Sequence, residues 1–369
     1  MTGLLSTFAL RGLTLKNRMV VSPMCQYSAR GGFVGDYHLV HLGRFALGGF
    51  SAVMVEATGV TPEGRISYGC PGLWSDNHIP GFARITDFLR AHRAASGIQL
   101  AHAGRKGSSI PPWLIGGKER EPDAEHWQTV APSAVAHGPG YGVPAALSET
   151  GIGDLVDAFA AAARRALAAG FDFVEVHSAH GYLLHQFLSP LGNQRTDHFG
   201  GSLDNRLRLP LMVVQAVRAA WPEDRPLFLR LSASDGVPGG WDIGDSVVFA
   251  QRARELGVDA VDVSAGGFEG GRFTPGPGMF LPWAATIRKE AGLPVMAVGL
   301  IEKVALAEAA VSQGQADLVA LGRGALDDPN WPLHAARDLG YETRDLWPKQ
   351  SGYAIERWPG KPPAHKKEA

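Results

Sequence analysis

Short apolar runs alternate with longer amphipathic segments along most of the chain. Eight runs rich in Val, Leu and Ala are apolar at consecutive positions, which is typical of parallel strands covered by helices on both faces. In chain order they are RMVVSPM from Arg18, SAVMVEAT from Ser51, GIQLAHAG from Gly97, FDFVEVHS from Phe171, LFLRLSAS from Leu227, DAVDVSAGG from Asp259, LPVMAVGL from Leu293 and DLVALGRG from Asp317. Between them lie segments with helical spacing, such as GDLVDAFAAAARRALAAG from Gly153, and several end in glycine, the usual residue after a helix.

Eight strand–helix units are the number found in a (β/α)8 barrel, so we predict a single α/β barrel of this type. A doubly wound sheet is the alternative, but the even alternation favours closure. Residues 7–16 predict a small hairpin at the barrel floor. The segment after the third strand, about residues 105–148, is too long for an ordinary connection, and its Trp and Tyr residues favour a packed lid. We expect a barrel over residues 1–345 and a C-terminal tail over residues 346–369.

Composition excludes several classes of partner. The 369 residues carry a formal net charge of -1, and the body of the chain has no basic block. We therefore expect neither nucleic acid nor an anionic membrane as a partner. The chain's two cysteines, Cys25 and Cys70, exclude a disulfide framework and fit a reducing cytosol. Since no segment resembles a signal peptide or a membrane span, we expect a soluble, cytoplasmic protein.

The ends of the predicted strands carry the polar residues, and active sites of barrels lie at the carboxyl ends of their strands. His177 and His180 follow the fourth run, with Tyr182 just behind them. They are candidates for metal ligands, buried core histidines, or N–H donors to a substrate oxygen. Zinc needs three or more protein ligands, and His102 is the only third candidate nearby, so we predict no metal. The favoured interpretation is a pair of donors that stabilise negative charge on a carbonyl or nitro oxygen, with Tyr182 as a proton donor.

Two further features at the strand ends predict a bound anion. Gly299 follows the seventh run, and Gly322 and Arg323 follow the eighth, where barrels commonly bind phosphate. The alternative is that these glycines only end their strands. Arg230 lies within the fifth, otherwise apolar, run. Its guanidinium must either face a ligand or form a buried ion pair with a carboxylate such as Glu56.

Four motifs resemble the old yellow enzyme family of flavin oxidoreductases. They are SPMCQY at Ser22, HSAHGYLLHQFLSP at His177, NQRTDHFGGSLDNRLR at Asn193 and ALGRGALDDPNW at Ala320. The resemblance runs from the N-terminal hairpin to about Trp358, and the stretch from residue 177 to 208 is its most specific part. Cys25 and the short chain indicate the bacterial xenobiotic-reductase and thermophilic-like branch. Phe199 and Asp204 depart from the family's usual Tyr and Glu, outside the predicted chemistry.

The resemblance implies a non-covalent FMN over the barrel mouth. Its implied contacts are Ser22, Pro23, Met24 and Cys25 along the ring, Ala57 and Gln99 at its polar edge, Arg230 at N1 and the C2 carbonyl, and Gly299, Gly322 and Arg323 at the phosphate. His177 and His180 would hold the substrate oxygen, and Tyr27 would close the pocket. Cys25 would tune the flavin potential; the alternative is an inert buried thiol.

The implied activity is reduction of activated alkenes, namely α,β-unsaturated carbonyls, imides and nitroalkenes. NADPH or NADH would reduce the flavin, and N5 would then deliver hydride to the alkene in a ping-pong cycle, with Tyr182 supplying the proton. Two other functions remain open. An aldolase or isomerase would need a Schiff-base lysine or a carboxylate base at a strand end, and Lys106 is a weak candidate for this role. A non-enzymatic flavin binder would not need the residues at 177, 180 and 182.

The tail is too apolar for a free end, since it contains Trp347, Tyr353, Ile355 and Trp358. In the branch that the sequence resembles, this segment crosses a dimer interface. We therefore expect a homodimer, or a homotetramer built from dimers, in which Arg357 and Trp358 complete the partner's pocket. The alternative is a tail folded back on its own barrel that buries the same aromatic side chains.

Overall fold

The computed structural model describes residues 2–114, 126–355 and 357–358. Within them, eight parallel strands close into a barrel in the order β10-β11-β12-β3-β4-β5-β8-β9. Their bounds are β3 Met19–Val21, β4 Ala52–Gly59, β5 Ala95–Ala101, β8 Phe173–Ser178, β9 Leu227–Ser232, β10 Ala260–Ser264, β11 Val295–Ala297 and β12 Leu318–Leu321. Each coincides with one of the eight apolar runs. The predicted (β/α)8 barrel is confirmed, and the doubly wound alternative is wrong, because β3 pairs with both β12 and β4.

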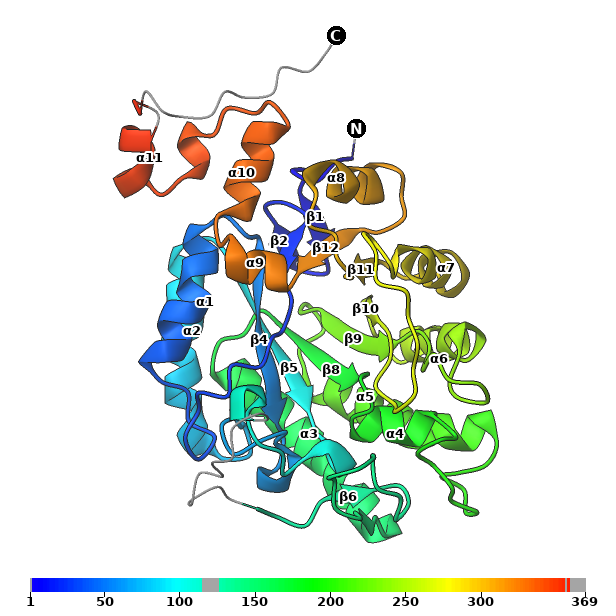
Figure 1. Cartoon of the computed structure of the whole chain (residues 1–369). Helices are drawn as coiled ribbons and strands as arrows, with labels where there is room; N and C mark the ends of the chain where they lie inside the picture. The colour runs from blue at the N-terminus through cyan, green and yellow to red at the C-terminus, as the bar shows by residue number, and fades with distance from the viewer. Residues whose placement is uncertain (1, 115–125, 356, 359–369) are drawn as a thin grey trace.

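Helices surround the barrel (Figure 1). Their bounds are α1 Asp36–Leu47, α2 Ile79–Ala91, α3 Glu149–Ala168, α4 Leu183–Leu188, α5 Leu203–Ala220, α6 Ile243–Glu255, α7 Leu281–Ala291, α8 Val304–Ser312, α9 Arg323–Asp327, α10 Trp331–Asp338 and α11 Lys349–Ile355. Helix α3 begins before the alanine-rich segment that predicted it, because Ser148 caps it by accepting a hydrogen bond from the Gly151 N–H at 3.1 Å. None of the described helices is long and apolar enough to cross a membrane.

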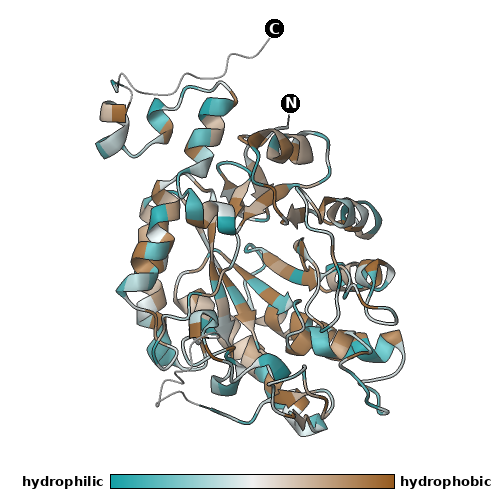
Figure 2. Cartoon of the chain, viewed as in Figure 1, coloured by the Kyte–Doolittle hydropathy of each residue, from teal (hydrophilic) through white to brown (hydrophobic). Residues whose placement is uncertain are grey.

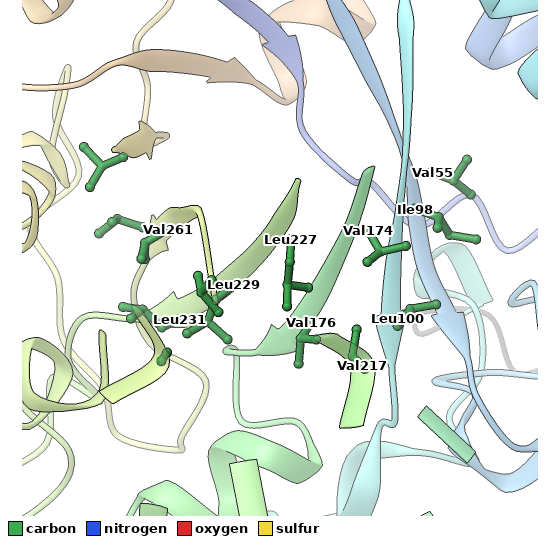
Figure 3. Close-up of a cluster of buried hydrophobic side chains, with 14 of the residues drawn as sticks. Val55, Ile98, Leu100, Val174, Val176, Val217, Leu227, Leu229, Leu231 and Val261 are labelled. Atoms are coloured by element: carbon green, nitrogen blue, oxygen red, sulfur yellow. The ribbon is translucent and has the colours of Figure 1, made fainter. Parts of the chain in front are cut away.

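The main core lies between strands and helices. Val174 and Val176 on β8 pack there with Leu227 and Leu229 on β9 (Figure 3). Since side chains alternate along a strand, the residues between them face the barrel interior. There, Phe173 and Phe228 belong to a second apolar cluster. Coloured by hydropathy, the strands are largely brown, whereas the helices carry teal positions as well (Figure 2).

A hairpin closes the floor of the barrel. Strands β1 Phe8–Leu10 and β2 Leu13–Leu15 pair antiparallel. Leu15 is part of the interior cluster, and Phe8, Leu10 and Leu13 pack against it. This apolar floor leaves the polar interior residues at the opposite end of the barrel, the mouth.

Two segments depart from the regular alternation of strands and helices. The long connection after β5 contains the 3-10 turns Gly104–Lys106 and Pro112–Leu114 and the short strands β6 Val130–Ala131 and β7 Ala145–Ala146. Part of the predicted lid, residues 115–125, lies outside the described residues. At the other end, α10, the turn Arg344–Leu346 and α11 extend away from the strands (Figure 1).

Candidate active site

The carboxyl ends of the eight strands gather the predicted residues at the mouth. Ser22 to Cys25 follow β3, Ala57 and Gln99 lie in β4 and β5, and His177 lies in β8. Arg230 is in β9, while Gly299 and Gly322 follow β11 and β12. Parallel strands in a closed barrel point the same way, so residues far apart in the chain meet at one rim.

The turn after β8 holds His180 in an unusual backbone conformation. His180 has a φ of 60° and Gly181 a φ of 70°. A Cβ at Gly181 would lie 2.0 Å from the Gly267 carbonyl oxygen, so this turn contacts the loop after β10 at a distance only glycine permits. The His180 N–H donates to Ser232 Oγ at 3.0 Å. These contacts fix the imidazole beside the end of β10.

His177, His180 and Tyr182 form one group of rings. The His177 ring centroid lies 5.1 Å from that of His180 and 5.1 Å from that of Tyr182, with interplanar angles of 87° and 82°. His180 Nδ1 lies 3.3 Å from His177 Nε2, and His180 Nε2 lies 2.7 Å from Ser264 Oγ. Three residues predicted from one motif therefore meet with Ser264, which the sequence placed only at a strand end.

Burial keeps both imidazoles neutral. It holds the pKa of His177 and of His180 well below the usual value, and the positive charge of Arg230 lowers both further. The Ala179 N–H donates to His177 Nδ1 at 3.2 Å, so the single proton of His177 resides on Nε2. His177 Nε2–H thus donates to His180 Nδ1, and His180 Nε2–H to Ser264. Each neutral ring retains one N–H donor.

Tyr182 is held as a neutral phenol next to a lysine. Burial raises its pKa well above the usual value, and the neighbouring Cys25 and Tyr27 raise it further. Lys106 Nζ lies 5.0 Å from the Tyr182 ring centroid and donates to the His180 carbonyl oxygen at 2.8 Å. Burial and nearby Arg105 lower the Lys106 pKa to about 8. Lys106, which the sequence did not place, supports both the phenol and the histidine turn.

Arg230 makes an ion pair, but with a different carboxylate from the one named on sequence grounds. Arg230 Nε lies 3.3 Å from Asp262 Oδ2, on the neighbouring strand β10, in direct register. Glu56 instead accepts a hydrogen bond from the Gln26 N–H at 2.8 Å. A second nitrogen of Arg230 donates to Ser22 Oγ at 3.3 Å. The guanidinium therefore both pairs with a carboxylate and reaches the mouth.

A second buried carboxylate lies beneath the mouth. Gln99 Nε2 donates to Glu175 Oε1 at 2.8 Å, from β5 to β8. Burial raises the pKa of Glu175 well above its usual value, and the nearby Asp262 carboxylate raises it further, against the opposing effect of Arg230. Burial also raises the pKa of Asp262. The Glu175 and Asp262 carboxyls therefore lie together beside Arg230, and burial favours the protonated form of each.

Glycines occupy the predicted phosphate position in the loops after β11 and β12. Gly299 has a φ of 112°, which favours glycine, and a Cβ there would lie 2.9 Å from the Phe280 ring. Gly322 precedes α9, and Arg323 is exposed. Helix α9 has only five residues, so an anion here would rely on backbone N–H groups and Arg323 more than on the helix dipole.

One wall of the mouth combines sulfur and aromatic side chains. Ala57 and Cys70 belong to a small buried cluster on which Cys25, Tyr27 and Tyr182 pack. The Tyr27 ring meets Trp113, in the long connection after β5, edge to face at a centroid distance of 5.7 Å. The predicted lid segment therefore reaches the residue that was expected to close the pocket.

Arg357 and Trp358 do not join this group within the single chain. They follow α11, both are exposed, and Trp358 is 57% exposed. Tyr353 is 61% exposed. Trp347, by contrast, is half-buried, and its ring centroid lies 6.1 Å from that of His334, so within one chain the tail covers Trp347 but leaves Tyr353 and Trp358 exposed.

Sequence reasoning assigned no role to Glu175, Asp262 or Cys70. For the two carboxylates a signal existed, since each interrupts an apolar run just as Arg230 does, and a buried charge requires a partner. Cys70 lies in a loop with no periodic pattern, so its position could not be inferred. Among the described residues, no group of three or more His, Cys, Asp or Glu side chains is placed to hold a metal ion.

Comparisons with known proteins agree with this geometry. The model of the NADH:flavin oxidoreductase / NADH oxidase family matches residues 4–342. An NADPH dehydrogenase of Geobacillus thermodenitrificans (strain NG80-2) is 46% identical over 341 residues, 92% of this chain and 95% of that protein. One of Bacillus pumilus (strain SAFR-032) is 44% identical over 340 residues, with 92% and 95% covered.

Solved structures of related enzymes share the fold. Morphinone reductase superimposes with a TM-score of 0.76 at 27% identity, covering 93% of this chain and 91% of that one. The old yellow enzyme homologue from Zymomonas mobilis superimposes with a TM-score of 0.74 at 26% identity, covering 95% and 98%. The chain therefore belongs to the NADH:flavin oxidoreductase / NADH oxidase family, as an FMN-dependent NADPH oxidoreductase of the old yellow enzyme type.

Proposed function

We propose that this enzyme reduces the C=C bond of activated alkenes: α,β-unsaturated carbonyls, imides and nitroalkenes. The observation that carries the proposal is the group formed by His177, His180 and Tyr182. Two neutral imidazoles and one phenol supply hydrogen-bond donors and a proton, and supply no nucleophile or metal ligand set. A substrate whose oxygen gains negative charge while a neighbouring carbon gains a proton matches these groups.

The residues at the mouth fit FMN. Ser22, Gln99 and Arg230 converge there with hydrogen-bonding groups, and Arg230 supplies the positive charge that an electron-rich flavin edge requires. Gly299 and Gly322 follow β11 and β12, where barrels of this type commonly bind phosphate, and a Cβ at Gly322 would meet only the Met24 sulfur at 3.6 Å. When bound, FMN supplies the hydride chemistry, accepting hydride from NADPH and giving it to the β-carbon of the alkene. Gly322 and Arg323 would hold its phosphate, and Pro23, Met24, Cys25 and Ala57 would line its ring.

Holding one substrate oxygen with both histidines requires a change of tautomer in His180. His177 already carries its proton on Nε2. His180 Nδ1 can donate beside it only if His180 Nε2 accepts a hydrogen bond. The Ser264 hydroxyl, 2.7 Å away, can be that donor, because a hydroxyl donates or accepts by rotating. Substrate would then take the place of the His177–His180 hydrogen bond and receive one N–H from each ring.

Tyr182 would transfer its proton to the α-carbon. Its raised pKa keeps the phenol protonated throughout the neutral pH range, so the proton is present when substrate arrives. The positive charge of the Lys106 ammonium, which lies over the Tyr182 ring, makes loss of the phenol proton easier than burial alone would allow. The Lys106 hydrogen bond to the His180 carbonyl oxygen also keeps Tyr182 and His180 close together. Tyr27 and the segment around Trp113 would limit water at this position.

Steady-state kinetics with NADPH and 2-cyclohexenone test the proposal. We expect the saturated ketone to form in an amount equal to the NADPH consumed, with parallel lines in double-reciprocal plots, because both substrates use one pocket. NADPH oxidation by oxygen with no saturated ketone would contradict it.

We also propose that two chains assemble and that Arg357 and Trp358 enter the partner's site. The exposure of Tyr353 and Trp358 supports this, since large apolar side chains at a chain end usually find a partner surface. The cytoplasmic location and the boundary between barrel and tail at residue 345 stay predictions.

A further inference from the structure

The chain's two cysteines lie on segments that run against each other beside the mouth. Cys25 follows β3, and Cys70 lies in the loop after β4. The Ala29 N–H donates to the Gly69 carbonyl oxygen at 2.8 Å. A Cβ at Gly69 would lie 2.4 Å from the Tyr27 carbonyl oxygen, so this glycine permits a close approach of the two backbones. The segments that carry Cys25 and Cys70 therefore lie side by side.

The two thiols affect each other's protonation, and Cys25 packs on the buried cluster that contains Cys70. The Ser67 N–H donates to Cys70 Sγ at 3.4 Å, and Ser67 Oγ lies 3.9 Å from it. The neighbouring Cys25 thiol and these donors lower the pKa of Cys70 to about 7, whereas Cys70 and burial raise the pKa of Cys25. Near neutral pH the pair holds one proton and one negative charge.

Access to the two thiols differs. Cys70 is fully buried in the apolar cluster of Ala57, Ile66, Ala101 and Ala103, whereas Cys25 is partly exposed at the mouth. An oxidant would meet Cys25 first, and Cys70 would lie directly behind it. An accessible thiol with a second thiol beside it is the arrangement of a reactive and a resolving cysteine.

We propose that Cys25 and Cys70 are an oxidisable dithiol, a modification site at which a hydroperoxide converts the two thiols into a disulfide. The inference goes beyond alkene reduction and does not depend on it.

The chemistry balances with hydrogen peroxide as the oxidant. Cys25 passes its proton to the neighbouring Cys70 thiolate, and the Cys25 thiolate so formed attacks one peroxide oxygen. The O–O bond breaks, and the leaving hydroxide takes a proton and departs as water, which leaves a sulfenic acid on Cys25. Cys70 then loses its proton and attacks the Cys25 sulfur. The S–S bond forms, the S–O bond breaks, and a second water leaves. Starting from one thiol and one thiolate, the pair has lost two electrons and one proton, and the peroxide has gained them together with one proton from the solvent.

The disulfide would alter the wall of the site. Tyr27 and Tyr182 pack on the same cluster as the two sulfur atoms. Oxidation removes the thiol proton of Cys25 and draws the segment that carries it toward the loop of Cys70. We therefore expect a shifted absorption band of the bound flavin in the oxidised protein, as a spectral sign of the modification.

Mass spectrometry of the purified holoenzyme tests the proposal without any alkene. The protein is reduced with dithiothreitol, freed of it, and treated with a stoichiometric amount of hydrogen peroxide. We expect both thiols to become unreactive to iodoacetamide together, the intact mass to fall by two hydrogens, and a tryptic peptide pair joined through Cys25 and Cys70. Dithiothreitol should restore both thiols.

Two variants serve as controls. In Cys70→Ser no linked peptide can form, and we expect dimedone to trap a sulfenic acid on Cys25. In Cys25→Ser we expect much slower oxidation, because the remaining thiol is buried. Wild-type protein that gains oxygen atoms at separate cysteines, retains two free thiols, or links only between chains would overturn the proposal. None of these outcomes bears on whether the enzyme reduces alkenes.

Discussion

Replacing Ser264 with alanine removes the group that we expect to set the tautomer of His180. Ser264 Oγ lies 2.7 Å from His180 Nε2. In the substrate complex, that nitrogen must accept a hydrogen bond so that Nδ1 can donate to the substrate oxygen. Without the hydroxyl, the proton of His180 moves to Nε2, and a lone pair on Nδ1 faces the substrate oxygen.

The expected loss of rate follows from the hydrogen bond between Ser264 Oγ and His180 Nε2. Removing this bond while His180 stays buried should raise the activation free energy of hydride transfer by about 1–3 kcal/mol. Because about 1.4 kcal/mol corresponds to a factor of ten, hydride transfer to an enone should slow about five- to 150-fold. Reduction of the flavin by NADPH should change little, since it develops less negative charge at the position between the two imidazoles.

Stopped-flow measurement of the two half-reactions separates these outcomes. Ser178→Ala is a matched control: Ser178 is a fully buried serine in β8 whose hydroxyl has no hydrogen-bond partner in the structure, so its loss should leave both half-reactions near the wild-type rate. The reasoning is refuted if Ser264→Ala reduces enones at the wild-type rate. Equal slowing of both half-reactions would instead indicate a general disturbance of the site.

Four further predictions concern the proton donor, the phosphate site, the buried histidines and the C-terminal tail. Tyr182→Phe should slow reduction of 2-cyclohexenone much more than reduction of a nitroalkene, because a nitronate can be protonated by water; equal slowing in single-turnover assays would count against a proton-donor role. Arg323→Ala should raise the dissociation constant for FMN about ten- to a hundredfold, the cost of one charge-assisted contact, and unchanged flavin retention in gel filtration would argue against phosphate binding there. The free energy of unfolding, measured in urea, should fall as pH is lowered from 7 to 5. Burial lowers the pKa of His102 to about 4 and also lowers the pKa values of His177 and His180. Between pH 7 and 5 the unfolded chain therefore binds protons that the folded chain does not. His102→Gln should make that dependence less steep, and a flat wild-type profile would contradict it. Truncation before Gln350 should lower the assembly mass in light scattering and raise the KM for enones together, and a truncated protein with unchanged mass and KM would exclude a shared site.

The sequence predicts the barrel well because each strand is apolar on both faces, and burial on both faces is a local property of eight separate runs. The motif at residue 177 likewise indicates the two histidines and the tyrosine, because its spacing brings them to one strand end. The partner of Arg230 needed more information. Asp262 is adjacent because β9 and β10 pair in register, whereas Glu56 lies on β4, which is not a neighbour of β9.

Contacts made by loop residues could not be predicted, because the path of a loop leaves no periodic pattern in the sequence. The approach of Cys70 to Cys25 depends on the path of the loop after β4 and on Gly69, and neither has a periodic signal. Lys106 reaches the His180 carbonyl because the 3-10 turn Gly104–Lys106 directs it there. The proposed place of Arg357 in a partner's site stays a prediction, because neither the sequence pattern nor the structure of one chain can test it.

The most direct test of alkene reduction follows the two hydrogens that enter the product. The enzyme is incubated with 2-methyl-2-cyclohexenone and unlabelled NADPH in D2O under anaerobic conditions, and the saturated ketone is analysed by NMR. Hydride from NADPH should appear as protium on the β-carbon to the extent that its transfer outpaces exchange of the flavin N–H with D2O. The proton from Tyr182, exchanged with solvent, should appear as deuterium on the α-carbon in one configuration, and Tyr182→Phe should form this product far more slowly. Complete flavin reduction by NADPH without any saturated ketone, or deuterium in both configurations at the α-carbon during the first turnover, would contradict the account.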